Sequence, residues 1–404
     1  MLIDEIKRQA ANILGSVIRN RRHLHANPEL SFQETQTSKF VKAQLDEMGI
    51  AWKAIAGTGV LAQIKGELPS EKVIALRADM DALPISENGN AEYTSMNQGV
   101  MHACGHDAHT SSLLGTASIL NSLTSKFGGT VKLLFQPGEE ILPGGATLMI
   151  KGGALENPRP SSITGQHVTN SIECGKIGIR KGKVMASMDE LRVTVYGKGG
   201  HGAMPHQNID PVVIASHIII ALQQIVSRFS NPLFPTVLSF GKVTANGAIN
   251  VIPDEVKLEG TFRTIDETWR AEAHDKMIKM ATGVAESLGG SCDFIIDRGY
   301  PVLSNEEKLT DRVTSYAREY LGDSNVVEME TMMAAEDFAW YSQITASCFY
   351  FLGTGNKEKG IDKPLHYSCF DIDENALAIS TGLMAYLAIR QLMPGEENSP
   401  GIKE

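Results

Sequence analysis

Cysteine, histidine and glutamate residues that can bind a metal ion follow several of the apolar runs in this sequence. Cys104 and His106 are separated only by Gly105, and His102 and His109 flank them. A turn can direct a thiolate and an imidazole at this spacing toward one ion, and both groups suit Zn²⁺ and its neighbours. A buried free cysteine beside a histidine at a helix start is the alternative interpretation of this pair taken alone. The two flanking histidines are expected, at most, to contact a metal ligand without binding the ion themselves.

Two adjacent carboxylates, Glu139 and Glu140, follow Pro137 and Gly138 after the apolar run Val131–Phe135. On an ordinary surface loop such a pair is simply solvated. At the carboxyl end of a strand, adjacent residues can point in different directions. One carboxylate can then bind a metal ion while the other accepts a proton from water activated by that ion.

His167 and His366 complete the set of candidate ligands. His167 follows the short run around Ile163, and His366 lies in the loop after Cys348–Leu352. A single histidine is more often structural than a ligand, so the assignment of both depends on their convergence with the other candidates. Asp81, which also follows a buried run, is expected to fix the orientation of a metal ligand by contacting it without binding the ion.

Alternating helices and strands must position these side chains. Helices are predicted over about 4–22, from a capping-box pattern at Ser31–Glu34 to Gly49, and over about 108–123. Short apolar runs typical of strands buried on both faces of a largely parallel sheet lie at Val60–Ile64, Val73–Leu76, Val131–Phe135 and Cys348–Leu352. In such a sheet ligands bind beyond the carboxyl ends of the strands, where the candidate residues fall.

The pattern changes near residue 185. Glu190–Tyr196 alternates with period two, which indicates a half-exposed strand, and Asp210 before Pro211 predicts the start of a helix that runs to about Phe229. Two strands, a helix and a last strand are then predicted at Thr236–Val243, Val256–Thr264, Glu267–Leu288 and Cys292–Ile296. The order β-α-β-β-α-β is that of a ferredoxin-like unit.

We therefore expect an α/β fold of two domains. A metal-binding catalytic domain with a mainly parallel sheet would be discontinuous, comprising residues 1–184 and 297–404. The ferredoxin-like α+β domain, residues 185–296, would be inserted into it.

Length and composition limit the functional classes. The 404 residues favour two domains, and 42% hydrophobic with 21% charged residues is typical of a globular protein. The formal net charge of −10 argues against nucleic-acid binding through a basic surface. No membrane segment is expected, because Ile214–Val226 is interrupted by polar residues and too short to span. The absence of a signal-like apolar core in Met1–Arg8 and the five scattered cysteines indicate a cytoplasmic protein, and Pro394–Glu404 is expected to be frayed.

Four segments carry a resemblance to a known family. They occur in the order Arg77–Pro84, His102–Asp107, Gln136–Glu140 and Gly199–His206. They closely resemble motifs of the amidohydrolase branch of the aminoacylase/carboxypeptidase-type dinuclear metallopeptidases. That branch includes hippurate hydrolases, N-acetyl-diaminopimelate deacetylases and plant auxin-conjugate hydrolases. The resemblance extends from about residue 21 to residue 387.

The resemblance implies a ligand set and a general base. Two divalent metal ions (Mn, Zn, Co or Ni) would be held by Cys104, His106, Glu140, His167 and His366. The first residue of the glutamate pair, Glu139, would be the general base. Gln166 and Leu365 depart from the family pattern beside two of the ligands without removing either ligand.

The resemblance also implies roles for the inserted domain. That domain would be a lid and a dimerisation domain, so the chain is expected to form a homodimer or a higher homo-oligomer. His201 would help to polarise the scissile carbonyl, often from the partner subunit. Asn250 and Arg263 would hold the substrate.

The expected activity is metal-dependent hydrolysis of the amide bond of N-acyl amino acids, with N-acetyl, N-benzoyl or related acyl groups. A di- or carboxypeptidase of the same superfamily is the alternative. A nucleophilic Cys104 with a histidine base would instead give activity that survives chelation and is lost on alkylation. A binding or scaffold protein that retained the fold without the chemistry would hold no metal.

Overall fold

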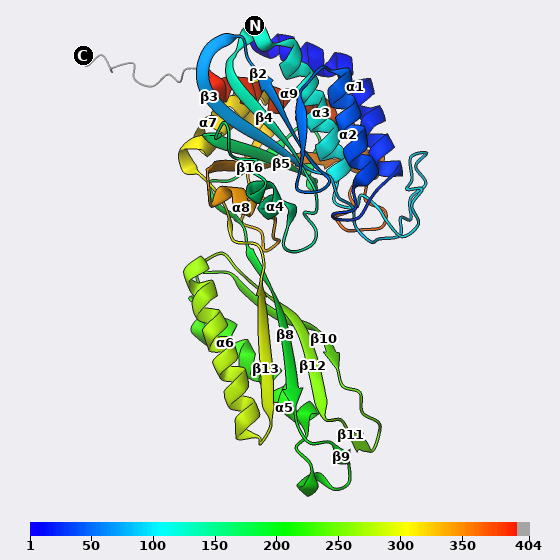
Figure 1. Cartoon of the computed structure of the whole chain (residues 1–404), viewed down its shortest axis with the longest axis vertical. Helices are drawn as coiled ribbons and strands as arrows, with labels where there is room; N and C mark the ends of the chain where they lie inside the picture. Colours follow the sequence, from blue (N-terminus) through cyan, green and yellow to red (C-terminus); the bar gives the residue numbers. More distant parts are fainter. Residues whose placement is uncertain (394–404) are drawn as a thin grey trace, which may run out of the picture. The chain divides into compact units, whose positions relative to one another are not determined.

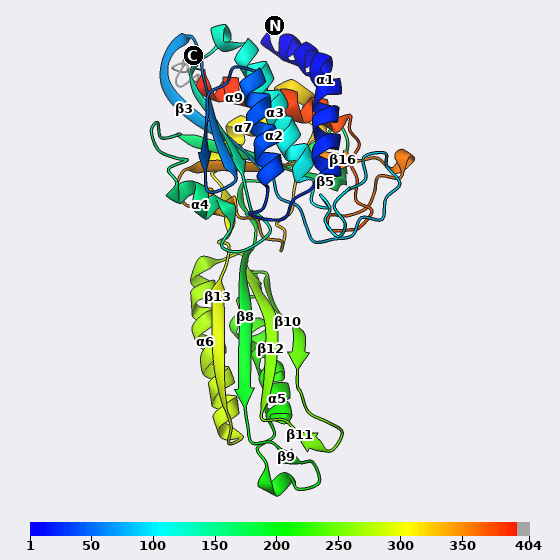
Figure 2. The same cartoon turned by 45° about the vertical axis from the view of Figure 1, so that its right-hand side comes forward.

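The computed structural model describes residues 1–393, which divide into two compact units (Figures 1 and 2). Unit 1 comprises residues 1–182, 304–330 and 340–393, and unit 2 comprises residues 183–303 and 331–339. The fraying predicted for Pro394–Glu404 lies outside the described residues.

An eight-stranded sheet forms the centre of unit 1. Its strands lie in the order β1 (Trp52–Ile55), β2 (Gly59–Lys65), β4 (Gly128–Gln136), β3 (Leu68–Asp79), β5 (Ser162–Glu173), β16 (Ala346–Gly355), β6 (Ile177–Ile179) and β15 (Val326–Glu328). The four middle strands β4, β3, β5 and β16 run parallel. The β1–β2 hairpin is antiparallel to β4 at one side, and β6 is antiparallel to β16 at the other. The predicted, mainly parallel sheet is thus confirmed.

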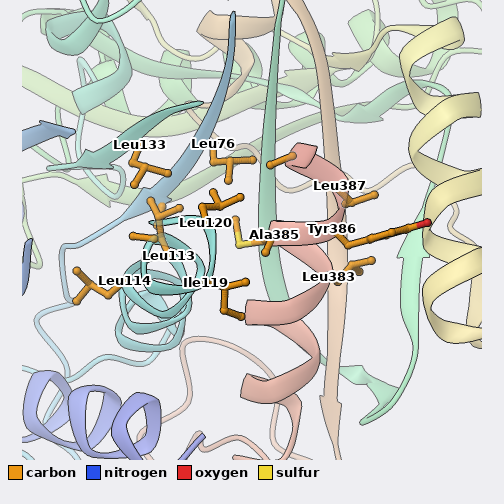
Figure 3. Packing of buried hydrophobic residues seen from close by; sticks show 14 of the residues in the cluster. Leu76, Leu113, Leu114, Ile119, Leu120, Leu133, Leu383, Ala385, Tyr386 and Leu387 are labelled. Carbon is orange, nitrogen blue, oxygen red and sulfur yellow. The ribbon is translucent and has the colours of Figure 1, made fainter. Parts of the chain in front are cut away.

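Long helices bury this sheet. They are α1 (Leu2–Ala26), α2 (Thr35–Glu47), α3 (His106–Ser122), α7 (Glu307–Leu321) and α9 (Ala376–Leu392). Side chains of α3 and α9 pack against one another and against Leu76 of β3 and Leu133 of β4 (Figure 3). A Cβ atom at Gly115 would lie 2.8 Å from side-chain atoms of both Val17 and Thr381, so its absence lets α1, α3 and α9 pack closely. The helix that begins at His106 is therefore rigidly held.

The polar residues before α2 do not form the predicted capping box. Ser31 Oγ donates to Asp81 Oδ2 at 2.6 Å, and α2 has no side-chain cap bond. Glu34 instead accepts the backbone N–H of Gly138 at 2.8 Å. The prediction was wrong because tertiary partners compete successfully for both side chains. Gly49 does follow the helix end with φ +68°, as predicted.

Unit 2 is built on a four-stranded antiparallel sheet. Its strand order is β10 (Thr236–Thr244), β12 (Glu255–Thr264), β8 (Ser187–Tyr196) and β13 (Ser291–Arg298). Helices α5 (Pro211–Gln224) and α6 (Glu267–Ser287) share a hydrophobic core with one face of this sheet (Figures 1 and 2). The observed order β-α-β-β-α-β and the pairing are those of a ferredoxin-like unit. Asp210 caps α5 by accepting the N–H groups of Val212 and Val213, as predicted.

The ends of unit 2 differ from the predicted boundaries. Residues 297–303 belong to unit 2, because β13 continues to Arg298 and the next residue, Gly299, donates its N–H to Asp189 on β8 at 3.2 Å. Residues 331–339 also belong to it, and Met332 donates its N–H to the carbonyl of Val184 at 2.9 Å. These pairings join segments distant in sequence, so the local pattern did not indicate them. The remaining elements are α4 (Gly145–Lys151), β7 (Gly182–Met185), β9 (Gly200–His201), β11 (Val251–Ile252), β14 (Leu303–Asn305) and α8 (Ala339–Ser342).

One helical run in residues 1–393, Pro211–Phe229, is long and apolar enough to cross a membrane by length and composition. It is longer than the apolar stretch considered from sequence because a π-helical turn, Ile225–Phe229, continues α5. Its residues Ile214, Ile218 and Leu222 are buried in the core of unit 2. The core helix of a folded domain meets the same criterion.

Candidate metal centre

All five candidate metal ligands lie in unit 1. Cys104 precedes α3 and His106 is its first residue, while Glu140 follows β4 and His366 lies between β16 and α9. His167 is inside β5 rather than at its carboxyl end, where the sequence placed it. The pairing of β3 with β5 ends at Arg77–Gly165, so His167 nevertheless lies beyond the last residue of β5 that pairs with β3.

The ligand atoms form two groups that share one sulfur. Those of Cys104, His106 and His167 lie within 4.8 Å of one another, and so do those of Cys104, Glu140 and His366. Cys104 Sγ is 3.4 Å from His167 Nε2, and His366 Nε2 is 3.5 Å from Glu140 Oε1. The structure therefore brings all five residues together. A thiolate, imidazoles and a carboxylate are a donor set that suits borderline divalent ions such as Zn²⁺.

The two groups differ in their exposure to solvent. Cys104, His106 and His167 are buried, whereas Glu140 is half-buried and the side chain of His366 is 53% exposed. A substrate can therefore approach from the side of Glu140 and His366.

Hydrogen bonds orient the two buried histidines. His167 Nδ1 lies 2.8 Å from the carbonyl oxygen of Val168, so it carries the proton and leaves Nε2 facing Cys104. His106 Nδ1 lies 3.2 Å from Asp81 Oδ1, while its Nε2 is buried and has no hydrogen-bond partner among the described residues. A buried imidazole nitrogen left in this way is suited to metal binding. Asp81 has the orienting contact that the sequence predicted.

The electrostatics of the pocket favour a cation. Burial, followed by the charges of Glu140 and Glu139, raises the pKa of the Cys104 thiol well above its usual value. Burial alone would lower the pKa of His106, but the carboxylates of Asp79 and Asp81 raise it to about 10. A divalent ion would offset the negative charge of these carboxylates. It would also displace one proton from the Cys104 thiol and one from His106.

His109 lies near this centre, and its ring is fully occupied by other contacts. His109 Nδ1 is 2.6 Å from Asp79 Oδ1, and Nε2 accepts the N–H of Val168 at 2.9 Å. His109 thus supports the backbone of the residue next to His167. Asp79 is paired in turn with Arg77 at 2.5 Å. Sequence reasoning did not assign these two charged residues a role, although charged residues at the end of an apolar strand run are a usable signal.

Glu139 and Glu140 are held by the backbone around Gly138. Glu139 is buried, and one of its oxygens lies within 4.8 Å of the ligand atoms of His106 and Glu140. Gly138 has φ +58°, and a Cβ atom there would lie 2.2 Å from the ring of Phe32. The tight turn at Gly138 thus presents two adjacent carboxylates to one centre, as the glutamate-pair hypothesis requires.

The three remaining candidate residues lie in unit 2. His201, in β9, and Asn250, just before β11, are exposed neighbours at one end of the sheet. Arg263, in β12, is half-buried and pairs with Met188 in register, whereas Glu255 pairs with Tyr196. Met188 and Tyr196 are eight positions apart on β8, which corresponds to about 26 Å at roughly 3.3 Å per residue. The structure therefore brings His201 and Asn250 together and places Arg263 at the opposite end.

Comparison with known proteins matches the family suggested by the motifs. The model of peptidase family M20/M25/M40 matches residues 75–390. An N-acyl-L-amino acid amidohydrolase of Geobacillus stearothermophilus is 45% identical over 309 residues, covering 76% of this chain and 83% of that protein. A thermostable carboxypeptidase 2 of Saccharolobus solfataricus is 38% identical over 393 residues, covering 96% of this chain and 98% of that protein.

A solved structure shows the same architecture. The YXEP protein of Bacillus subtilis, described as a dinuclear metal binding peptidase from the M20 family, is 35% identical and covers 95% of this chain and 99% of its own. It superposes on this chain with a TM-score of 0.82. The predicted resemblance and fold class are confirmed: the chain belongs to peptidase family M20/M25/M40.

Proposed function

We propose that this protein is a metal-dependent amidohydrolase that cleaves N-acyl amino acids to a carboxylic acid and a free amino acid. The observation that carries the proposal is that the five candidate ligands converge on one centre. The carboxylate of Glu139, which is not one of them, lies beside this centre. The amidohydrolase named among the relatives supports this substrate class. The named carboxypeptidase keeps a di- or carboxypeptidase as the second candidate, which would differ only in the acyl side of the substrate.

In this proposal the five candidate ligands would hold two divalent ions, and Cys104 belongs to both groups. Cys104, His106 and His167 would hold one ion, and Cys104, Glu140 and His366 would hold the other, with Mn, Zn, Co and Ni as the candidate metals. When bound, such ions polarise a carbonyl oxygen and lower the pKa of water.

The side chains of the protein supply the proton transfers and the substrate contacts. Glu139 accepts a proton from the attacking water and passes it to the leaving amine nitrogen. His201 donates a hydrogen bond to the carbonyl oxygen as negative charge develops there. Arg263 binds the substrate carboxylate, and Asn250 hydrogen-bonds the substrate. Arg263 donates to the carbonyl of Met333 at 3.0 Å and pairs with no carboxylate within residues 1–393, so its charge is available to an anion.

We further propose that His201 acts from a second copy of the chain. A small substrate bound at Arg263 cannot also contact His201 of the same copy of unit 2, because β9, which carries His201, follows the end of β8 opposite to the end that pairs with Arg263. Unit 2 offers a surface for a homodimer or higher homo-oligomer in the exposed residues Val213 and Ile220 of α5 and in the unpaired edge of β10.

All five cysteines lie within the described residues and are unpaired, which supports a cytoplasmic location.

The substrate class can be tested with a panel of N-acetyl, N-benzoyl and longer N-acyl amino acids, assayed with Mn²⁺ and Zn²⁺. We expect hydrolysis that a chelator abolishes and added metal restores. For each good substrate, the analogue whose carboxylate is replaced by a carboxamide should be hydrolysed less efficiently. Arg263→Gln should raise KM for the substrate with the free carboxylate by roughly 10- to 100-fold and leave KM for the carboxamide analogue unchanged. Lys257→Gln, an exposed change on the same strand, is the control. Faster cleavage of unacylated dipeptides would favour the peptidase alternative.

The role of Glu139 is tested by Glu139→Gln. This variant should bind two ions and lose turnover by roughly 10²- to 10⁴-fold, because the base is removed and the ligands remain. Metal content and kcat are measured together. Glu140→Gln is the matched control and should lose one ion. A near-normal rate in Glu139→Gln would remove Glu139 as the base.

Catalysis across subunits predicts complementation. Glu139→Gln and His201→Ala should each be nearly inactive alone. Unfolded, mixed in equal amounts and refolded together, they should recover about a quarter of wild-type activity, since half of the dimers are mixed and each mixed dimer has one complete site. No recovery, with mixed dimers demonstrated by a tag, would place His201 and Glu139 of one active site in the same chain.

Metal binding should be linked to protons. The raised pKa of Cys104 and the pKa of about 10 for His106 mean that both groups are protonated at pH 7 in the metal-free chain. Binding must therefore release about two protons, and metal affinity must fall as the pH is lowered. Titration calorimetry in buffers of different ionisation enthalpy measures the number released, which Cys104→Ser should reduce by about one. Binding heats independent of the buffer would contradict the assignment.

A further inference from the structure

The most exposed proposed ligand, His366, sits on a long loop between β16 and α9. Its backbone has φ +66°, a left-handed conformation that a residue with a side chain rarely adopts. Its N–H donates to the carbonyl of Ala103 at 2.8 Å, one residue before Cys104. A strained position of this kind persists only where surrounding contacts hold it.

A buried guanidinium joins this loop to the start of α3. Arg21 of α1 is fully buried, and its Nε donates to Asp107 Oδ2 at 2.7 Å. Its Nη2 donates to Asp371 Oδ1, also at 2.7 Å. Asp107 directly follows His106, and Asp371 comes five residues after His366. One side chain therefore connects the segments that carry ligands of the two groups.

The Asp371 carboxylate has a second partner, which is half-buried. The hydroxyl of Tyr93 donates to Asp371 Oδ2 at 2.7 Å, and the guanidinium of Arg21 lies 4.8 Å from the centre of the Tyr93 ring. The carbonyl oxygen of Asp371 accepts from the side chain of Asn170 at 2.9 Å. Asp371 is thus held by three elements other than its own loop.

The ligands of the other group do not rely on Asp371. His106 is oriented by Asp81 and is part of α3, and His167 is oriented by the carbonyl of Val168 within β5. Loss of the Asp371 contacts would release the His366 loop while these two histidines keep their positions.

We propose that Asp371, held by Arg21 and Tyr93, is a positioning residue that sets the affinity of the ion bound by Cys104, Glu140 and His366. The proposal rests on the ligand set assigned above. The ion bound by Cys104, His106 and His167 is expected to be independent of Asp371, so the two ions should respond differently to one substitution.

The test is a titration of the metal-free protein with Co²⁺, followed by visible absorption and by equilibrium dialysis. The wild type should bind two ions. Asp371→Asn should weaken binding of the second ion by about tenfold, because the loop that carries His366 is released, and leave the affinity for the first ion within about twofold. Tyr93→Phe, which removes only the hydroxyl, should shift the second ion in the same direction by less.

A matched control lies in the same loop. Asp362 forms an exposed ion pair with Lys363, so Asp362→Asn should change neither affinity. Equal affinities for both ions in Asp371→Asn, Tyr93→Phe and the wild type would overturn the proposal, as would equal weakening of both ions. If Asp371→Asn does not fold, Tyr93→Phe decides. His366→Ala separates the two proposals, because retention of both ions in that variant would refute the ligand set itself.

Discussion

Charge removed from water must be paired, and unit 1 removes a great deal of it around Cys104. Asp79, Asp81 and Asp107 are each almost completely buried. Each is matched by a base or by donors: Arg77 and His109 for Asp79, His106 and Ser31 for Asp81, and Arg21 and His25 for Asp107. Leaving any of these carboxylates unpaired would strongly destabilise the fold. One of the contacts that permit this burial, between Asp81 and His106, also orients a proposed metal ligand.

The proposed centre is built largely on elements that are packed closely in the core. Helix α3 is buried on nearly all sides between the sheet, α1 and α9, so His106 has little freedom to move. His167 lies in a strand with a partner along its length. His366 alone among the proposed ligands is both exposed and on an irregular segment. In the proposal above, the long-range contacts of Asp371 replace for His366 the rigidity that α3 supplies to His106 and β5 supplies to His167.

The sequence predicts features that depend on neighbouring residues, and it fails where distant residues compete. Asp210 before Pro211 specifies a helix start through its own local hydrogen bonds, and the structure has that cap. Ser31 and Glu34 show an equally good local pattern, but Asp81 and Gly138, far along the chain, take their side chains. The link from Arg21 to Asp371 spans 350 positions and leaves no periodic signal. The proposed ligand residues could be named because several short motifs occur in one order, whereas the contacts that hold them could not be predicted from the sequence.

The geometry of unit 2 places a different kind of demand on function. The proposed carboxylate-binding residue, Arg263, lies about 26 Å along β8 from the end of that strand at Tyr196, by the rise of a strand. The proposed carbonyl-polarising residue, His201, follows that end in β9. An amino acid and its acyl group are much smaller than this distance. If both roles hold, no arrangement of a single chain lets one rigid copy of unit 2 make both contacts with one substrate. Assembly would then be a requirement of the chemistry. The exposed apolar residues of α5 would contribute to catalysis by forming the contact between copies, and not only to stability.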